Sequence, residues 1–428
     1  MIVRTMRRVS CLLVLLAVQC PALLRAADVS FADIITGRAA IVDDPAYFDR
    51  LQPMEMETKT GRPLEATTLA GQRAECRRRY QLAVQEFSGD EQTAIRAATA
   101  AIDRAVRKDY PRYADTPWSF LKVAGHIEGG FPHTRGKHIV LAESVCRWIV
   151  SESHTSRVAP VNVMELLLHE QMHVFQRANS DLFDSLYTGQ WGLIRAKSIK
   201  TCPWIVEHQM VNPDAIDCPW VFPIRRPEGT RYIWPLCSLS DGPGPKQMAA
   251  DFSMFAFYLV PDGDGYRVEQ SGDGRPVYSE LLSVRAYCEV FGPSTNIYHP
   301  HEAAADLFAK LVIYDAYRSK WMSASQRAAR EKTFAPLREW FRRNLAKAKI
   351  ASGGRGVPYM GQISTITSAN QPSAVRSTFR PCQVTALIST SSWCRAGSTG
   401  SPRAVPCSPA SLTATVKSDN RSLRTWNA

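Results

Sequence analysis

The chain has 428 residues, of which 45% are hydrophobic and 21% are charged. This is a globular composition, which excludes a collagen-like, coiled-coil or wholly disordered protein. The formal net charge of +12 by itself suggests a nucleic acid or an acidic membrane surface as partner.

The positive charge is concentrated at the two ends of the chain. Residues 1–27 contribute +4 and residues 351–428 contribute +7, so that residues 28–350 carry only +1. A nearly neutral body lacks the basic face that a nucleic acid requires. We therefore expect no nucleic-acid partner, and the alternative of a basic protein that binds nucleic acid or the cell envelope depends on the ends alone.

The first 27 residues have the pattern of a secretory signal peptide. Three arginines precede an apolar run over residues 11–18, and alanines follow near a plausible cleavage site. The run is too short to span a bilayer and is followed by Pro21 and Arg25, which disfavours an uncleaved anchor. We therefore expect an exported chain, periplasmic or extracellular, with no stable membrane insertion after signal cleavage.

Regular elements then follow in an α+β order. Residues 28–65 form an irregular N-terminal extension, either a propeptide or part of the fold. Ser88 and Glu91 form a capping box at the start of a helix. The expected elements are helices at 70–86 and from Ser88 to before Pro111, strands at 118–125 and 137–144, and a helix that Asn162 caps.

This last helix contains the pattern on which the functional prediction depends, MELLLHEQMHVFQ at 164–176. His169 and His173 are four residues apart, so both imidazoles project from one face of a helix and can bind one tetrahedral zinc ion. Glu170 lies about 100° further round the helix and can instead reach a zinc-bound water. H-E-x-x-H is the signature of zinc metallopeptidases, and the alternative is a buried helix with ordinary core histidines.

A third protein ligand is required, with the fourth position left for water. The Gly and His of the metzincin pattern are absent, because Gln176 and Asn179 occupy those positions. The candidates for the third ligand are Glu302, His299, His301, Glu207 and His208. Glu302 is favoured because it begins a helix and is followed by Asp306 on the same helical face.

These residues resemble the gluzincin clan of zinc metallopeptidases, in which an E-x-x-x-D helix completes the H-E-x-x-H site. The resemblance implies that His169, His173 and Glu302 are zinc ligands. It also implies that Glu170 is the general base and that the carboxylate of Asp306 orients a ligand histidine through its other ring nitrogen. The resemblance covers the motifs alone, and 128 residues separate His173 from Glu302.

The gluzincin resemblance also implies a zincin-like α+β fold, with a small sheet, backing and active-site helices, and a helical C-terminal part. The catalytic domain would span 66–350. Its segment at about 180–295, rich in Pro, Gly and Trp, would be an inserted loop-rich subdomain. The last two helices are expected at 301–317 and 325–350, the latter interrupted by Pro336.

The implied activity is hydrolysis of a peptide or protein substrate by a water on one catalytic Zn²⁺, activated by Glu170. Tyr298 and His299, which precede Glu302, are candidates for stabilising the oxyanion. By the same resemblance, the strand before the metal helix, within 129–144, would bind substrate by strand addition. The alternative is a non-catalytic exported binding protein on a zincin scaffold.

Two further features concern the tail and the cysteines. Residues 351–428 contain 14 Ser and 9 Thr with a single acidic residue, which predicts a disordered segment that is a spacer rather than a basic interaction tail. The body holds six cysteines without a C-x-x-C pair, so disulfides are permitted and a thiolate metal site is disfavoured.

Overall fold

The computed structural model describes residues 28–155, 160–241, 246–292, 294 and 296–346. All of them belong to one contact unit, which spans Met1–Val357. The predicted signal peptide at 1–27 and the predicted tail at 351–428 lie outside the described residues.

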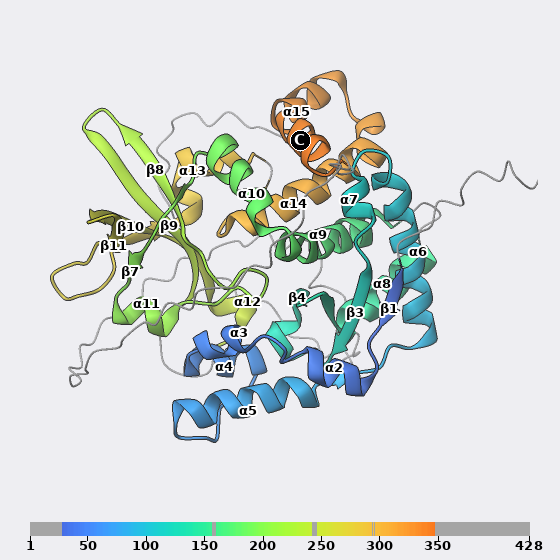
Figure 1. Cartoon of the computed structure of the whole chain (residues 1–428), viewed down its shortest axis with the longest axis horizontal. Helices are drawn as coiled ribbons and strands as arrows, with labels where there is room; N and C mark the ends of the chain where they lie inside the picture. Colours follow the sequence, from blue (N-terminus) through green and yellow to red (C-terminus); the bar gives the residue numbers. More distant parts are fainter. Residues whose placement is uncertain (1–27, 156–159, 242–245, 293, 295, 347–428) are drawn as a thin grey trace, which may run out of the picture. The chain divides into compact units, whose positions relative to one another are not determined.

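Two β-sheets and the helices around them make up an α+β fold (Figure 1). The first sheet has the order β1–β3–β5–β4, with β2 paired to β3. Its strands are β1 (Val29–Phe31), β2 (Val84–Gln85), β3 (Trp118–Val123), β4 (His133–Arg135) and β5 (His138–Ala142). β1, β3 and β5 are parallel, whereas β4 is antiparallel to β5. The N-terminal extension is therefore part of this sheet from its first described residues.

The second sheet lies within the segment for which the sequence predicts loops and short strands. It has the order β6–β8–β9–β10–β11–β7, with β12 paired to β10. Its strands are β6 (Ile194–Arg195), β7 (Ile199–Lys200), β8 (Trp220–Arg226), β9 (Gly229–Leu239), β10 (Phe252–Asp262), β11 (Gly265–Val268) and β12 (Tyr278–Glu280). Pro223, Pro235 and Pro261 lie inside the three long strands. Proline is rare within strands, so its presence here explains why the sequence pattern did not predict these long strands.

Helices surround both sheets. Those before the first metal motif are α2 (Ile34–Ala40), α3 (Pro45–Arg50), α4 (Pro53–Thr60), α5 (Leu69–Leu82), α6 (Gly89–Val106), α7 (Pro111–Ala114) and α8 (Glu143–Thr155). The later ones are α9 (Val161–Ala178), α10 (Ser180–Ser185), α11 (Pro203–His208), α12 (Met248–Asp251), α13 (Arg285–Phe291), α14 (Pro300–Ile313) and α15 (Ala324–Asn344).

The helix predictions hold in their positions and differ in some of their ends. The capping box of Ser88 and Glu91 is present at the start of α6. The metal-motif helix α9, however, begins before Asn162, and no side chain caps it. α15 continues through Pro336 instead of being interrupted there.

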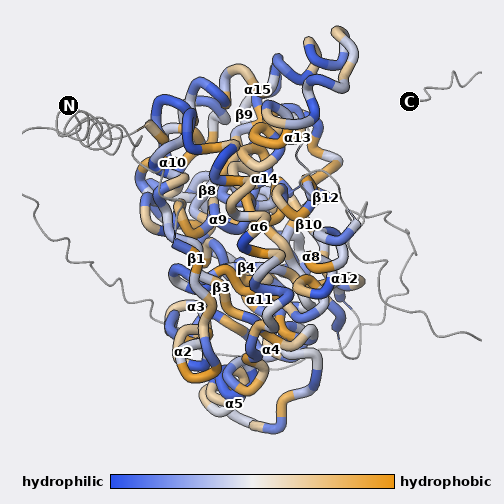
Figure 2. Tube along the Cα trace, turned by 90° about the vertical axis from the view of Figure 1, so that its right-hand side faces the viewer, coloured by the Kyte–Doolittle hydropathy of each residue, from blue (hydrophilic) through white to orange (hydrophobic). Residues whose placement is uncertain are grey.

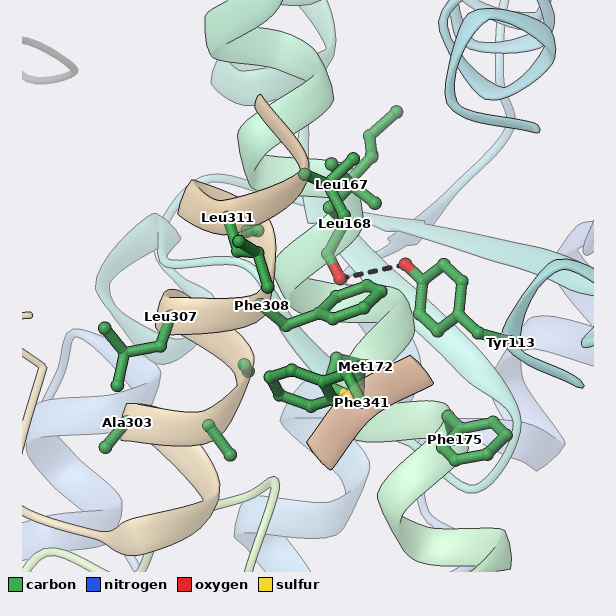
Figure 3. Packing of buried hydrophobic residues seen from close by; sticks show 14 of the residues in the cluster. Tyr113, Leu167, Leu168, Met172, Phe175, Ala303, Leu307, Phe308, Leu311 and Phe341 are labelled. Atoms are coloured by element: carbon green, nitrogen blue, oxygen red, sulfur yellow. Dashed lines mark hydrogen bonds between the residues drawn. The ribbon is translucent and has the colours of Figure 1, made fainter. Parts of the chain in front are cut away.

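The two helices that carry the predicted metal ligands, α9 and α14, pack against each other in the main hydrophobic core. Ala303, Ala304 and Ala305 are fully buried in α14, and small side chains of this kind let two helix backbones approach closely. Figure 3 shows Phe308 of α14 beside α9, where the Tyr113 hydroxyl donates a 3.0 Å hydrogen bond to the carbonyl of Leu168.

Helices α14 and α5 differ in both hydropathy and burial. The mostly hydrophobic α14 contrasts with the mostly hydrophilic α5 in Figure 2. α14 lies inside the core and α5 covers the smaller core around Tyr80. None of the helices in the described part of the chain is long and apolar enough to cross a membrane. The six described cysteines are free thiols, so none of the permitted disulfides is formed.

Candidate metal centre

Helix α9 carries both histidines of the predicted motif. Their ring centroids are 4.7 Å apart, and their Nε2 atoms are 3.0 Å apart. His173 is fully buried, and the side chain of His169 is 17% exposed. The spacing of four residues therefore delivers two imidazole nitrogens to one point, as predicted.

Glu302, in the first turn of α14, brings a carboxylate to the same point. Its Oε2 lies 3.3 Å from Nε2 of His169, and its Oε1 lies 3.4 Å from Nε2 of His173. α14 begins here because the His299 ring accepts a hydrogen bond from the N–H of His301 and because Pro300 occupies the first helical position. The structure thus joins Glu302 to the two histidines across the 128 intervening residues.

The three donor atoms fit a small divalent cation. Ligand atoms at about 2.0–2.1 Å from a tetrahedral Zn²⁺ are separated by roughly 3.4 Å. The observed separations of 3.0, 3.3 and 3.4 Å are close to this value. Among the described residues, His169, His173 and Glu302 are the one group of His, Cys, Asp and Glu side chains found that could hold a metal ion. We call them the triad.

The other candidate ligands are not joined to the triad. Both ring nitrogens of His299 are engaged by backbone groups. His208 stacks on Trp204 with ring centroids 4.2 Å apart, and Glu207 is exposed in α11. His301 is half-buried, and its carbonyl oxygen accepts a hydrogen bond from a glutamine. Among the candidates for the third ligand, Glu302 alone therefore joins the two histidines.

Glu170 is the buried carboxylate beside the triad. It is 4% exposed, and its Oε2 has no hydrogen-bond partner among the described residues. Burial raises the pKa of this carboxyl, although the charges of His169 and His173 oppose the rise. A buried polar oxygen without a hydrogen-bond partner is costly, so its presence beside the triad requires an explanation.

The charges of the triad depend on one another. Burial alone would lower the pKa of His173, but the nearby carboxylates, chiefly Glu302, together raise it. Burial alone would raise the pKa of Glu302, but the charge of His173 and hydrogen bonds from both histidines bring it well below its ordinary value. The negative charge of Glu302 and the positive charge of a protonated histidine therefore stabilise each other at one buried point.

A glutamine that sequence reasoning missed orients His173. Gln176 Oε1 lies 2.8 Å from His173 Nδ1. The Gln176 amide nitrogen in turn donates to the carbonyl of His301 at 3.0 Å and to the hydroxyl of Tyr187 at 3.3 Å. When Nδ1 carries the ring proton and donates it to an acceptor, Nε2 keeps its lone pair for a metal. The available signal was its position three residues after His173, on the same helix face.

Asp306, whose carboxylate was predicted to orient a ligand histidine, is engaged by a lysine instead. Its carboxylate accepts a 2.7 Å hydrogen bond from Lys310, one turn further along α14. Tyr298, the candidate for stabilising the oxyanion, packs near Phe252 and Met210. Burial raises the pKa of the Tyr298 hydroxyl well above its ordinary value, and the nearby Glu302 carboxylate adds to the rise. The structure therefore brings Tyr298 near the triad but engages Asp306 with a lysine.

Two asparagines also missed by sequence reasoning contact Glu302. Asn212 Nδ2 donates to Oε1 at 2.8 Å, and Asn296 Nδ2 donates to Oε2 at 2.6 Å. Neither residue belongs to a local motif, since both are far from H-E-x-x-H in the sequence and neither lies in a helix or strand. The fold brings Asn212 to Glu302 from 90 positions away, whereas Asn296 lies six residues before Glu302.

The edge strand β4 is covered where the sequence predicts strand addition. The N–H of Thr134 donates to Oδ1 of Asp214 at 2.7 Å, and the carbonyl of Thr134 accepts from Arg135 at 3.2 Å. These are the groups that an added strand would use. A peptide that joins β4 at Thr134 must therefore displace Asp214.

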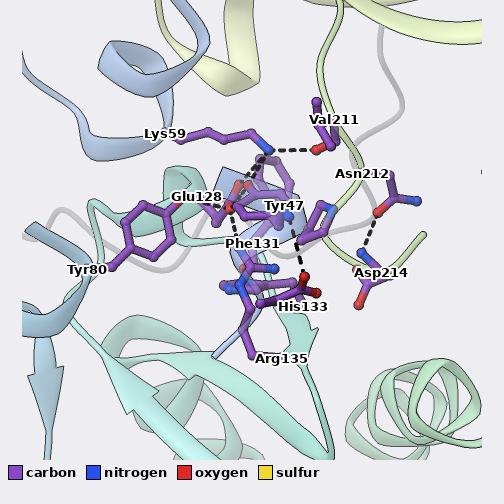
Figure 4. Close-up of polar contacts among 12 residues, drawn as sticks. Tyr47, Lys59, Tyr80, Glu128, Phe131, His133, Arg135, Val211, Asn212 and Asp214 are labelled. Carbon is purple, nitrogen blue, oxygen red and sulfur yellow. Dashed lines mark hydrogen bonds and ion pairs between the residues drawn. The ribbon is translucent and has the colours of Figure 1, made fainter. Parts of the chain in front are cut away.

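A second buried polar group lies beside β4, and we call it the Glu128 cluster (Figure 4). Its members are Tyr47, Glu55, Lys59, Tyr80, Glu128 and Arg135. One oxygen of Glu128 accepts from the Tyr80 hydroxyl at 2.7 Å and from Arg135 at 3.0 Å. Lys59 lies 3.3 Å from the other oxygen and 3.0 Å from Glu55. Glu128 adopts a φ of +49°, a strained conformation that these contacts hold in place.

Comparison with protein-family models, curated proteins and solved structures finds no significant match to this chain. The fold class that the structure supports is therefore α+β with two sheets, and the site is argued from its own geometry.

Proposed function

We propose that this chain is a zinc-dependent metallopeptidase, exported as its N-terminal pattern predicts, that hydrolyses peptide bonds in a peptide or protein substrate. The observation that carries the proposal is the convergence of His169, His173 and Glu302 from two helices, with donor atoms 3.0 to 3.4 Å apart. A functional carboxylate, Glu170, lies beside them with one oxygen unpartnered.

The donor set favours zinc over other ions. Imidazole nitrogens suit zinc and its neighbours in the periodic table, whereas calcium and magnesium prefer oxygen ligands alone. Two histidines and one glutamate are the ligands of several catalytic zinc sites, in which a fourth position serves the reaction.

The residues of the site have separate roles in the proposed reaction. When bound, zinc supplies Lewis-acid polarisation of the scissile carbonyl and lowers the pKa of water. Glu170 accepts the proton of the attacking water and passes it to the leaving amine nitrogen. Gln176 holds the His173 ring so that Nε2 faces the triad. Tyr298 stays the candidate for stabilising the oxyanion, because its half-buried side chain brings a hydroxyl near Glu302.

The test is hydrolysis of a mixed peptide library by the full chain loaded with zinc. We expect Glu170→Gln to lower the rate about 10²- to 10⁴-fold, the usual contribution of a general base, while zinc stays bound. Glu165→Gln is the matched control, because Glu165 lies on the same helix and pairs with Arg318 at 2.9 Å. A Glu170→Gln variant as active as Glu165→Gln would contradict the proposal.

A zinc-loaded chain that cleaves no peptide in such a library would instead favour the non-catalytic binding protein. The unpartnered oxygen of Glu170 argues for the enzyme, because a purely structural zinc site has no use for a buried free carboxylate.

A further inference from the structure

We infer that Asn212 and Asn296 are positioning residues that clamp the Glu302 carboxylate for the metal, and that supplying this clamp is one role of the long segment between the two motifs. The inference rests on the proposed zinc site. Both asparagines lie between His173 and Glu302 in the sequence, in the stretch that the motif pattern leaves unexplained.

The clamp engages each oxygen of Glu302 once. Asn212 donates to Oε1 and Asn296 donates to Oε2, at 2.8 and 2.6 Å. The same two oxygens face His173 and His169 respectively. One amide donor per oxygen fixes the plane of the carboxylate and leaves a second lone pair of each oxygen toward the histidines. Glu302 is thus oriented before a metal arrives.

The donors are neutral amides, which matters for a cation site. A lysine or arginine in the same place would neutralise the carboxylate and repel the incoming ion. An amide satisfies the hydrogen-bonding requirement of the buried Glu302 and leaves its charge to the metal. Among the described residues, no lysine or arginine forms an ion pair with Glu302.

Asn212 is itself held in place on both sides (Figure 4). Its Oδ1 accepts from the N–H of Asp214 at 2.9 Å. The neighbouring Val211 donates its N–H to Glu55 at 2.6 Å and accepts from Lys59 at 2.7 Å. The short segment 211–214 therefore connects the Glu128 cluster to Glu302. An 8% exposed asparagine with such fixed neighbours is pre-organised to act on its acceptor.

The experiment measures Zn²⁺ affinity of the full chain by competition with a chromophoric chelator, with no peptide substrate. Asn212→Ala and Asn296→Ala are each made in the native sequence and in a Glu302→Ala background. In the native sequence we expect each to lower zinc affinity about 10- to 100-fold, as loss of an outer-shell partner does. In the Glu302→Ala background the same changes should lower affinity less than about 2-fold, because the clamp has nothing left to hold.

Asn179→Ala is the matched control. Asn179 also donates its amide, to the carbonyl of Phe175 at 2.9 Å, but makes no contact with the triad. Its removal should leave zinc affinity unchanged in both backgrounds. Equal losses for Asn212→Ala with and without Glu302 would mean that Asn212 acts through the fold in general, and would overturn the clamp. A native chain that binds no zinc would instead overturn the proposed function and the clamp together.

Discussion

The Glu128 cluster and the triad are both buried groups of charged side chains, but their charges are balanced differently. In the Glu128 cluster two carboxylates, Glu55 and Glu128, meet two cations, Lys59 and Arg135. At the triad, Glu302 meets two imidazoles, and Glu170 lies beside them with a free oxygen. Among the described residues, no lysine or arginine forms an ion pair with either of these two carboxylates.

This difference separates a structural group from a binding site. A buried charge requires a counter-charge or a metal, because desolvation otherwise costs several kcal/mol. The Glu128 cluster contains its own counter-charges and so can hold helix α4, strand β4 and segment 211–214 together without a ligand. The triad gathers donors without a fixed cation, which is the arrangement that a metal completes.

The largest expected effect tests the structural half of this comparison. Glu128→Gln removes the carboxylate that faces Lys59 and Arg135 in a fully buried place. We expect the free energy of unfolding to fall by about 3–5 kcal/mol, the usual loss when one partner of a buried pair is removed. Urea unfolding of the metal-free chain measures it. Glu289→Gln breaks an exposed pair with Arg285 and should leave the free energy of unfolding nearly unchanged.

The effect of Glu128→Gln on the free energy of unfolding should also depend on pH. Burial alone would raise the pKa of Glu128, but Lys59, His133 and Arg135 lower it from 4.5 to about 2. Stabilisation by a carboxylate with a lowered pKa is complete above the ordinary value and is lost as the pH falls toward the lowered one. The difference between native chain and Glu128→Gln should therefore shrink from pH 4.5 toward pH 2. A difference that stays constant over this range would contradict the assignment.

A smaller expected effect tests the triad as a metal-binding site. Free zinc at about 100 times its dissociation constant should raise the free energy of unfolding by about 2.7 kcal/mol, because the ion binds the folded chain alone. Glu302→Ala should lose most of this gain, whereas Glu289→Gln should keep all of it. Thermal or urea unfolding with and without zinc provides the measurement, and an equal gain in both variants would place the metal elsewhere.

The smallest effect distinguishes two candidate partners of the ligands. Gln176→Leu should lower zinc affinity about 10- to 100-fold, because His173 Nδ1 loses its acceptor. Asp306→Asn should change zinc affinity less than about 2-fold, since Asp306 bonds Lys310 and reaches neither histidine in the structure. Chelator competition measures both variants. A larger loss for Asp306→Asn would restore the role that the gluzincin resemblance implies.

The sequence predicted the parts of the site that local periodicity encodes. The i, i+4 spacing of His169 and His173 is a property of a helix, and Glu302 was found because its own helix carries a second carboxylate one turn later. The α+β order of helices and first-sheet strands was also predicted from local pattern, since α6 has a clear helical period and β3 is a short run of almost entirely buried residues.

The missing parts depend on contacts between distant segments. Asn212 and Asn296 lie outside regular elements and reach Glu302 only once the fold is formed. Strand β1 has three residues and is stable because it pairs with β3, 89 positions later. The long strands β9 and β10 contain prolines that weaken the strand pattern, and their partners supply the register. Contacts formed in the folded chain therefore determine these strands and site residues, which the local sequence pattern does not predict.

The most direct test of the central claim is the zinc content of the full chain after equilibration with zinc and removal of free metal. A double variant, His169→Ala with His173→Ala, is compared with His133→Ala and His208→Ala, which remove other buried histidines. We expect about one zinc per chain in the native protein and in the two controls, and none in the double variant. Equal zinc in all four proteins would contradict the assignment of the triad as the metal centre.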